Sequence, residues 1–170
     1  KFNSDFEAEN FLQVPEPLIQ KDFSRIMSLK DGSRKMSKSE LSDLSRINLT
    51  DNKDMVINKI KKAKTDPLPM PSNLRDLEER PEAKNLLGIY SSLTNSSLEK
   101  SIEMFAGKNF SEFKEKLSEV LVDKIQPISE EIKKLLNDKL YLDNILLEGV
   151  ERANIIASKK IKKIKEIVGF

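Results

Sequence analysis

The pentapeptide Lys35-Met36-Ser37-Lys38-Ser39 has the clearest capacity for chemistry in this 170-residue chain. Its two ammonium groups stand three positions apart and are interleaved with hydroxyl side chains. Lysine is a compact cation on a flexible stem, and hydroxyl and backbone N–H groups donate hydrogen bonds, so this combination suits the binding of a polyphosphate. Composition by itself favours a plainer interpretation, which is a solvated basic loop.

The amino-acid composition excludes several other kinds of site. The chain has no cysteine and no histidine, which rules out disulfide frameworks, thiol nucleophiles, Ser-His-Asp triads and metal sites built on these residues. Thirty basic and twenty-eight acidic residues leave a formal net charge of +2, so the chain is not a polycation. Because no apolar run exceeds three residues, neither a membrane span nor a signal peptide is expected.

The first part of the chain has an irregular sequence. Six of the seven prolines lie between positions 15 and 81. The short apolar runs at 11–14 and 25–29 predict extended segments, since they are too brief for helices and turn residues bound them. Asp31-Gly32 predicts a turn after the second segment, and a polar loop is expected over 33–39.

A helical period begins near Asp51, which is a plausible N-cap. One face of this helix carries the apolar residues Val56, Ile60 and Ala63. The opposite side, facing solvent, is expected to carry the lysines at positions 59, 61, 62 and 64. Prolines at 67, 69 and 71 then predict a stiff connector, so we expect a domain boundary near position 75.

Two further helices are predicted after this connector. Pro81 suits the first turn of a helix, where its missing N–H costs nothing. Ser96 and Glu99 have the spacing of a capping box for the next helix. Gly107 stands where the C-terminal cap of that helix is expected.

The end of the chain predicts long helices that complete a bundle. Pro127 interrupts one apolar stripe, and a kink or break is expected there because proline cannot donate a helical hydrogen bond. The last helix is predicted from about Leu140, with a core-facing stripe formed by Leu142, Leu146, Val150, Ala153, Ala157, Ile161 and Ile164. Together these segments predict about four or five antiparallel helices.

The string Lys35 to Ser39 matches the K-M-S-K-S signature loop of class I aminoacyl-tRNA synthetases at all five positions. The surrounding sequence resembles the tryptophanyl family of this class, in order, over nearly the whole chain. The similar segments are 25–29, Thr65-Asp66, 81–91 and 148–157. Glu40, where the family more often has aspartate, and the proline-rich 67–71 connector depart from the commoner pattern and bear on the subgroup.

The resemblance implies a mainly α fold, in which a helical bundle of the anticodon-binding type follows a short α/β remnant of a class I, Rossmann-like nucleotide-binding domain. Residues 1–50 would end the catalytic domain and carry the signature loop, 51–74 would be a connecting helix and linker, and 75–170 the helical tRNA-binding domain. The family's histidine-containing signature cannot occur here, and the chain starts with Lys1 rather than Met. We therefore expect that signature, the tryptophan pocket and most of the sheet upstream, in a longer protein.

Residue roles also come from the resemblance. Lys38 and Lys35 are the expected catalytic residues, and Lys38 would stabilise charge that develops on the β,γ-phosphates of ATP. The backbone of Ile26 would contact the adenine ring, and Met36 would pack when the loop closes. The expected ATP-binding set is Ile26, Lys35, Met36, Ser37, Lys38 and Ser39. ATP is a substrate, Mg²⁺ is expected to accompany it, and no protein metal site is expected.

The resemblance implies a tryptophan–tRNA ligase whose partners are tRNA, ATP and tryptophan, and which works in the cytoplasm as a full-length homodimer. This chain by itself is expected to be inactive. Two alternatives stay open: the sister tyrosyl enzyme, and a non-catalytic helical module that binds RNA or protein. The lysines of helix 51–64 and of 159–165 are open to two interpretations, contact with tRNA or solvated helix surface.

Overall fold

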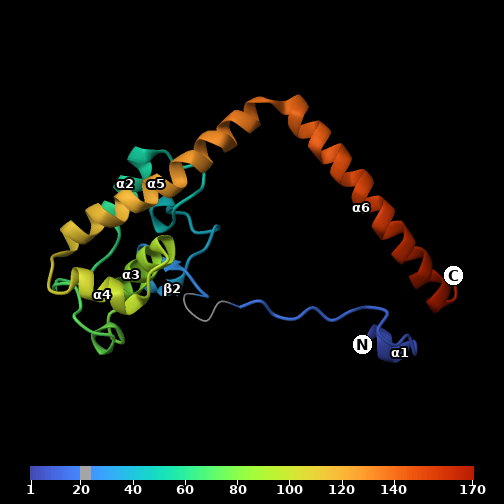
Figure 1. The fold of residues 1–170 in the computed structure, drawn as a ribbon, viewed down its shortest axis with the longest axis horizontal. Helices are drawn as coiled ribbons and strands as arrows, with labels where there is room; N and C mark the ends of the chain where they lie inside the picture. The colour runs from blue at the N-terminus through green and yellow to red at the C-terminus, as the bar shows by residue number, and fades with distance from the viewer. Residues whose placement is uncertain (20–23) are drawn as a thin grey trace. The chain divides into compact units, whose positions relative to one another are not determined.

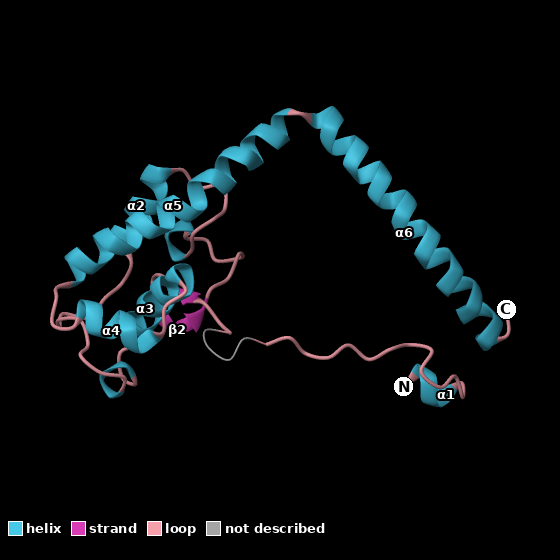
Figure 2. Cartoon of the chain, in the orientation of Figure 1, coloured by secondary structure: helices cyan, strands magenta, loops and turns pink. Residues whose placement is uncertain are grey.

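The computed structural model describes residues 1–19 and 24–170. It divides into two compact units. The first contains residues 1–19 and 134–170, and the second contains the described residues 24–133. Figures 1 and 2 show a mainly helical chain, as the sequence predicts. Its described residues also contain one small hairpin.

The second unit begins with the antiparallel hairpin of β1 (Met27–Ser28) and β2 (Asp31–Lys35), in which Met27 pairs with Lys35. A short 3-10 turn, η1 (Asp43–Ser45), leads to α2 (Lys53–Lys62). A second 3-10 turn, η2 (Arg75–Leu77), precedes α3 (Pro81–Thr94), α4 (Leu98–Phe105) and α5 (Phe110–Asn137). The last turn of α5 belongs to the first unit, together with α1 (Phe2–Asp5) and α6 (Lys139–Val168).

One hydrophobic core holds the second unit together. At its centre the ring centroids of Tyr90 and Phe105 lie 5.0 Å apart, and those of Phe105 and Phe113 lie 4.8 Å apart, both edge to face. Such pairs stabilise the fold beyond the area they bury. The other members of this core are Leu29, Val56, Ile60, Ala63, Met70, Leu77, Ala83, Leu86, Leu87, Ile102, Leu117 and Leu121.

The proline-rich connector is packed into this core instead of separating two bodies. Met70 is buried, its N–H donates to the carbonyl of Lys108 over 2.8 Å, and its carbonyl accepts from the N–H of Gly107 over 3.1 Å. Core residues come from both sides of position 75. The boundaries at 50 and 75 therefore do not coincide with units of packing, and they stay a proposal about function.

The helix termini follow the expected chemistry with shifts of one residue. Pro81 opens α3 as predicted. The N-cap of α2 is Asn52, whose Oδ1 accepts from the Met55 N–H, because the Asp51 carboxylate is engaged elsewhere. Ser97 caps α4 in place of Ser96, whose hydroxyl contacts neighbouring hydroxyls instead. Since side-chain caps satisfy free N–H groups at a helix start, either neighbour can serve.

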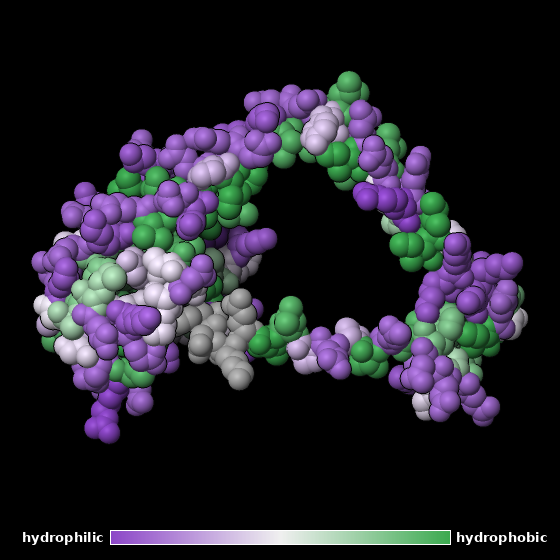
Figure 3. All heavy atoms as spheres, viewed as in Figure 1, coloured by the Kyte–Doolittle hydropathy of each residue, from purple (hydrophilic) through white to green (hydrophobic). Residues whose placement is uncertain are grey.

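The long helices differ from expectation in two ways. Of the kink or break expected at Pro127, the break is absent, since α5 runs through this residue as one helix. In α6 no residue is buried, and Leu146 and Val150 of the expected core stripe are 65% and 53% exposed. Within its own compact unit, α6 is accompanied among the described residues by the short α1, the loop after it and the last turn of α5, which are too small to cover such a stripe. Figure 3 shows apolar side chains along α6 between hydrophilic ones.

The first segment of the chain also differs from expectation. Residues 11–14 form no strand. Their backbone is bonded to a side chain of α1 instead of to another strand, since the Asn3 amide donates to the Leu12 carbonyl. The rings of Phe2 and Phe11 lie 6.1 Å apart, and the Lys160 ammonium lies 3.9 Å from the Phe11 ring centroid.

The hairpin turn lies at Leu29 and Lys30, so Asp31 and Gly32 belong to β2 and not to the turn as predicted. Gly32 is needed here because its backbone runs against the start of α3. A Cβ atom at this position would lie 2.6 Å from the backbone nitrogen of Glu82 and 2.6 Å from the carbonyl carbon of Pro81. Close approach of two backbones explains the glycine.

We expect Gly32→Ala to destabilise the chain by about 1–3 kcal/mol, because the backbone of α3 must shift to admit the methyl group. Gly149→Ala is the control, since nothing lies within 4 Å of its added Cβ on α6, and the exchange favours a helix by about 0.5–1 kcal/mol. Urea unfolding followed by circular dichroism measures both. A Gly32→Ala chain as stable as the original would contradict the close approach.

Candidate functional site

The predicted phosphate-binding residues begin at the open end of the hairpin. Lys35 is the last residue of β2, and its side chain is exposed. The next residue, Met36, is partly buried and donates its N–H to the carbonyl of Ile26 over 3.1 Å. Ile26, Lys35 and Met36, three of the six predicted residues, therefore lie together at the open end of the hairpin. Ile26 and Met36 are ten positions apart in the sequence.

The other three predicted residues form a turn that leaves the hairpin. The hydroxyl oxygens of Ser37 and Ser39 lie 2.9 Å apart, and the Ser39 N–H donates to the Ser37 hydroxyl over 3.3 Å. Between them Lys38 is exposed. Since the two serines close the turn around it, the Lys38 side chain extends from a short, locally hydrogen-bonded segment. The polar loop expected over 33–39 is thus a strand as far as Lys35 and a turn after it.

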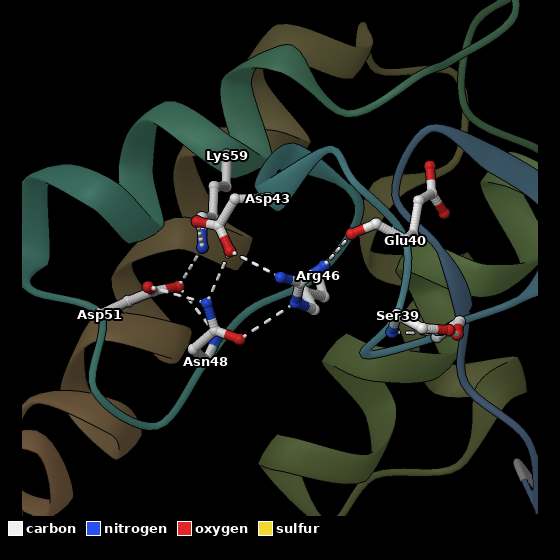
Figure 4. Close-up of polar contacts among 8 residues, drawn as sticks. Ser39, Glu40, Asp43, Arg46, Asn48, Asp51 and Lys59 are labelled. Carbon is white, nitrogen blue, oxygen red and sulfur yellow. Dashed lines mark hydrogen bonds and ion pairs between the residues drawn. The ribbon is translucent and has the colours of Figure 1, made fainter.

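A polar network fixes the chain where it leaves this turn (Figure 4). The Arg46 Nη1 atom donates to the Glu40 carbonyl over 3.0 Å, and its Nε atom donates to Asn48 Oδ1 over 3.3 Å. The Nη2 atom lies 3.2 Å from a carboxylate oxygen of Asp43. Each nitrogen of the guanidinium therefore has its own partner, which suits the rigid fork of arginine.

The same network continues into α2 through a buried lysine. The Lys59 ammonium lies 2.6 Å from the carboxylates of both Asp43 and Asp51, and Asn48 also bonds to both aspartates. Lys59 is 2% exposed and Asp51 is 1% exposed. Hydrogen bonds from Lys59 and then from Asn48 lower the pKa of Asp43 below its ordinary value, so this carboxylate stays charged.

The burial of Lys59 corrects the expectation that it faces solvent. The signal that could have shown this is its spacing, because Lys59 follows Val56 by three positions and precedes Ala63 by four. Residues at these separations share one helix face. Arg46, Asn48 and Asp43 were not among the predicted site residues, since no local pattern connects a loop exit to a later helix.

Helix α3 and the segment after α2 hold the hairpin from its other side. The Asn85 side chain bonds to both backbone polar groups of Met27, accepting from its N–H and donating to its carbonyl, each over 3.0 Å. The Leu29 carbonyl accepts from the N–H of Lys64 over 2.7 Å. The ammonium of Lys64 bonds to Glu82 over 2.8 Å, which raises the pKa of the lysine and lowers that of the carboxyl. The hairpin that carries the loop is therefore hydrogen-bonded to α3 and to the segment after α2.

A cleft, distinct from the phosphate loop, lies beside the hairpin. The cleft, of about 940 Å³, is lined by Arg25 and Met27 beside the hairpin and by residues of α3 and α4, including Lys84 and Asn85. It is separate from the Lys35–Ser39 turn.

In the described part of the chain, no group of three or more acidic side chains is placed to hold a metal ion. Among the described helices, none is long and apolar enough to cross a membrane.

Comparisons with known proteins show the family to which the chain belongs. The family of class I tRNA synthetases for tryptophan and tyrosine (W and Y) matches residues 1–126. The chain is 46% identical to the tryptophan–tRNA ligase of Caulobacter vibrioides over 170 residues, and 51% identical to that of Rickettsia felis over 168 residues. These alignments cover 100% and 99% of the chain but 49% and 50% of the relatives. The chain thus spans about half the length of the curated relatives it matches.

Solved structures show the same fold. The tryptophanyl-tRNA synthetase of Mycoplasma pneumoniae matches 99% of the chain with a TM-score of 0.81 at 24% identity, over 50% of its own length. The synthetase of Campylobacter jejuni in complex with ADP and tryptophan matches with a TM-score of 0.67 at 22% identity, also over 50% of its length. Taken together with the matched residues 1–126, these observations show that the chain belongs to the class I tRNA synthetases of the W and Y family.

Proposed function

We propose that this chain is part of a tryptophan–tRNA ligase and that residues 35–39 bind the phosphates of ATP. The observation that carries the proposal is the complete Lys-Met-Ser-Lys-Ser string in an exposed turn, with its base hydrogen-bonded to Ile26. The reaction joins tryptophan and ATP to give tryptophanyl-adenylate and pyrophosphate. The tryptophanyl group is then transferred to the 3′ end of the tRNA.

Charge movement in the first step explains the need for lysines. The carboxylate of tryptophan attacks the α-phosphorus, and the bond from that phosphorus to the oxygen shared with the β-phosphorus breaks. Negative charge therefore accumulates on the departing pyrophosphate. An ammonium group at this oxygen stabilises the transition state more than the ground state, which is the requirement for catalysis. Lys38 is the proposed group, because its flexible stem can follow the phosphate as it leaves.

The other loop residues have supporting roles in this proposal. Lys35 adds a second cation to the phosphate site, and Ser37 and Ser39 shape the turn between the two lysines. Met36 would pack when the loop closes, and the Ile26 backbone would contact the adenine ring. Mg²⁺ is expected to arrive with ATP.

The helical part of the chain is proposed to contact tRNA. Residues 75–170 would form the anticodon-binding region, with exposed lysines of α6 (159, 162, 163 and 165) available for phosphate contacts. Lys160 of the same cluster contacts Phe11 in this structure. The full-length enzyme is proposed to work as a homodimer in the cytoplasm. Relatives named for tryptophan favour this amino acid over tyrosine.

Amino-acid-dependent exchange of pyrophosphate into ATP tests the proposal on the full-length enzyme that carries this sequence. We expect exchange with tryptophan, and rates with tyrosine at least about 10⁴-fold lower, because each side chain needs its own hydrogen-bonding pocket. Exchange driven by tyrosine would establish the sister enzyme instead. No exchange with either amino acid, in a folded full-length protein, would favour a non-catalytic module.

A further inference from the structure

We propose that Arg46 is a positioning residue for the phosphate loop, because it holds the point at which the loop rejoins the fold. The inference rests on the proposed function and adds a residue outside the Lys35–Ser39 signature. Arg46 is not proposed to touch ATP. Arg46 holds the backbone of Glu40, and the position of Glu40 in turn limits where Lys38 can lie.

The loop has one backbone attachment at each end. On the entry side, the Met36 N–H donates to the Ile26 carbonyl over 3.1 Å. On the exit side, the Glu40 carbonyl accepts from Arg46 over 3.0 Å. Only residues 37–39 lie between these attachments. Four Cα steps separate Met36 from Glu40, so the chain between them spans at most about 13–14 Å, and the two attachments limit how far the Lys38 backbone can travel.

The exit attachment is strong because Arg46 is itself held. Its side chain is 17% exposed, and its other two nitrogens bond to Asn48 and Asp43. Asn48 in turn donates its backbone N–H to Asp51 over 2.9 Å and its side-chain amide to Asp43 over 2.9 Å. Figure 4 shows Arg46 between the Glu40 carbonyl on one side and these groups on the other.

Opposite charges around Arg46 balance one another, which allows its guanidinium to be largely buried. The two aspartates are matched by two cations, Arg46 and Lys59, and Lys59 bonds to both carboxylates. Buried charges are tolerated when they are paired and hydrogen-bonded. Through Asp43 and Lys59, the guanidinium therefore links the loop exit at Glu40 to α2. Lysine in its place could keep the charge, but not three directed hydrogen bonds.

The consequence concerns the rate of adenylate formation more than substrate binding. Lys38 must reach the departing phosphate, and misplacement of a catalytic group by about 1 Å can reduce a rate by about 100-fold. Losing the exit attachment widens the range of positions that Lys38 occupies. We therefore expect a decrease in kcat of about 10- to 100-fold, with little change in the KM for tryptophan, since the tryptophan pocket is proposed to lie elsewhere.

The test uses Arg46→Lys in the full-length enzyme with Arg80→Lys as the matched control. Arg80 is 12% exposed, bonds to Asp66 through two nitrogens and reaches the Leu68 carbonyl, but it has no contact with the loop. Both variants lose the same chemical group from a similar environment. We expect kcat for pyrophosphate exchange to fall 10- to 100-fold in Arg46→Lys and less than twofold in Arg80→Lys, at comparable thermal midpoints.

A second measurement follows the loop itself. Cleavage of the Lys38–Ser39 bond by a lysine-specific protease, identified by mass spectrometry, is expected to be several-fold faster in Arg46→Lys than in the original enzyme and unchanged in Arg80→Lys. Equal kcat and equal cleavage in the two arginine variants would overturn the role of Arg46.

Lys38→Ala separates this inference from the proposed function. If Lys38→Ala abolishes exchange while Arg46→Lys behaves like Arg80→Lys, the positioning role is wrong and the phosphate loop stands. If Lys38→Ala leaves exchange unchanged, the proposed function of the loop is wrong, and the role of Arg46 falls with it.

Discussion

Lys38→Ala in the full-length enzyme is expected to lower kcat for tryptophan-dependent pyrophosphate exchange by about 100- to 1,000-fold, by analogy with the loss of one oxyanion-stabilising group. The physical reason is that charge on the departing pyrophosphate develops only as the reaction proceeds. A group that stabilises this charge affects the transition state and leaves ground-state binding of tryptophan nearly unchanged. Steady-state kinetics of the exchange reaction measure both constants.

Lys100→Ala is the control for this prediction. Lys100 is also exposed, but it lies on α4, away from the Lys35–Ser39 turn. We expect it to change kcat less than twofold. An effect of Lys38→Ala that appears only in the KM for tryptophan would contradict the assignment of Lys38 to the phosphates.

Lys59→Met is expected to destabilise the chain by about 3–5 kcal/mol, the usual cost of removing one partner from a buried ion pair. Methionine replaces most of the apolar stem of lysine but leaves Asp51, at 1% exposure, without its cation. Because whole domains are stable by only about 5–15 kcal/mol, this is a large share of the total. Urea unfolding followed by circular dichroism measures the change.

Lys61→Met, two positions along the same helix, provides the comparison. Lys61 is exposed, and surface substitutions of this kind usually change stability by less than about 0.5 kcal/mol. Similar losses in the two variants would mean that the ion pair of Lys59 has no special importance. A free energy of unfolding for Lys59→Met close to that of the original chain would also contradict a stabilising role for this ion pair.

Local sequence chemistry was sufficient for the helices and for the signature loop. Proline at the start of α3, glycine after α4 and apolar spacing in α2 are properties of neighbouring residues, and the structure confirms them. The Lys35–Ser39 string could also be identified directly, since all its members are consecutive. Fold class followed from the same signals.

Long-range pairing explains what could not be predicted. The contact of Arg46 with the Glu40 carbonyl and the burial of Lys59 between two aspartates depend on how α2 packs behind the loop, and no local pattern encodes that arrangement. Gly32 was interpreted as a turn residue because glycine favours turns, whereas its position against the backbone of Pro81 and Glu82 is a tertiary effect. The exposed stripe of α6 was expected to be buried because amphipathic spacing does not say which partner covers it.

A single-turnover measurement of adenylate formation tests the central claim, that the Lys35–Ser39 loop stabilises the departing pyrophosphate, most directly. The full-length enzyme, Lys38→Ala and Lys100→Ala are mixed with saturating ATP and tryptophan, and the first adenylate formed on each enzyme is followed in time. We expect a rate about 100- to 1,000-fold slower for Lys38→Ala only, with tryptophan binding unchanged in all three. Adenylate formation at the same rate in Lys38→Ala as in the original enzyme would contradict the claim.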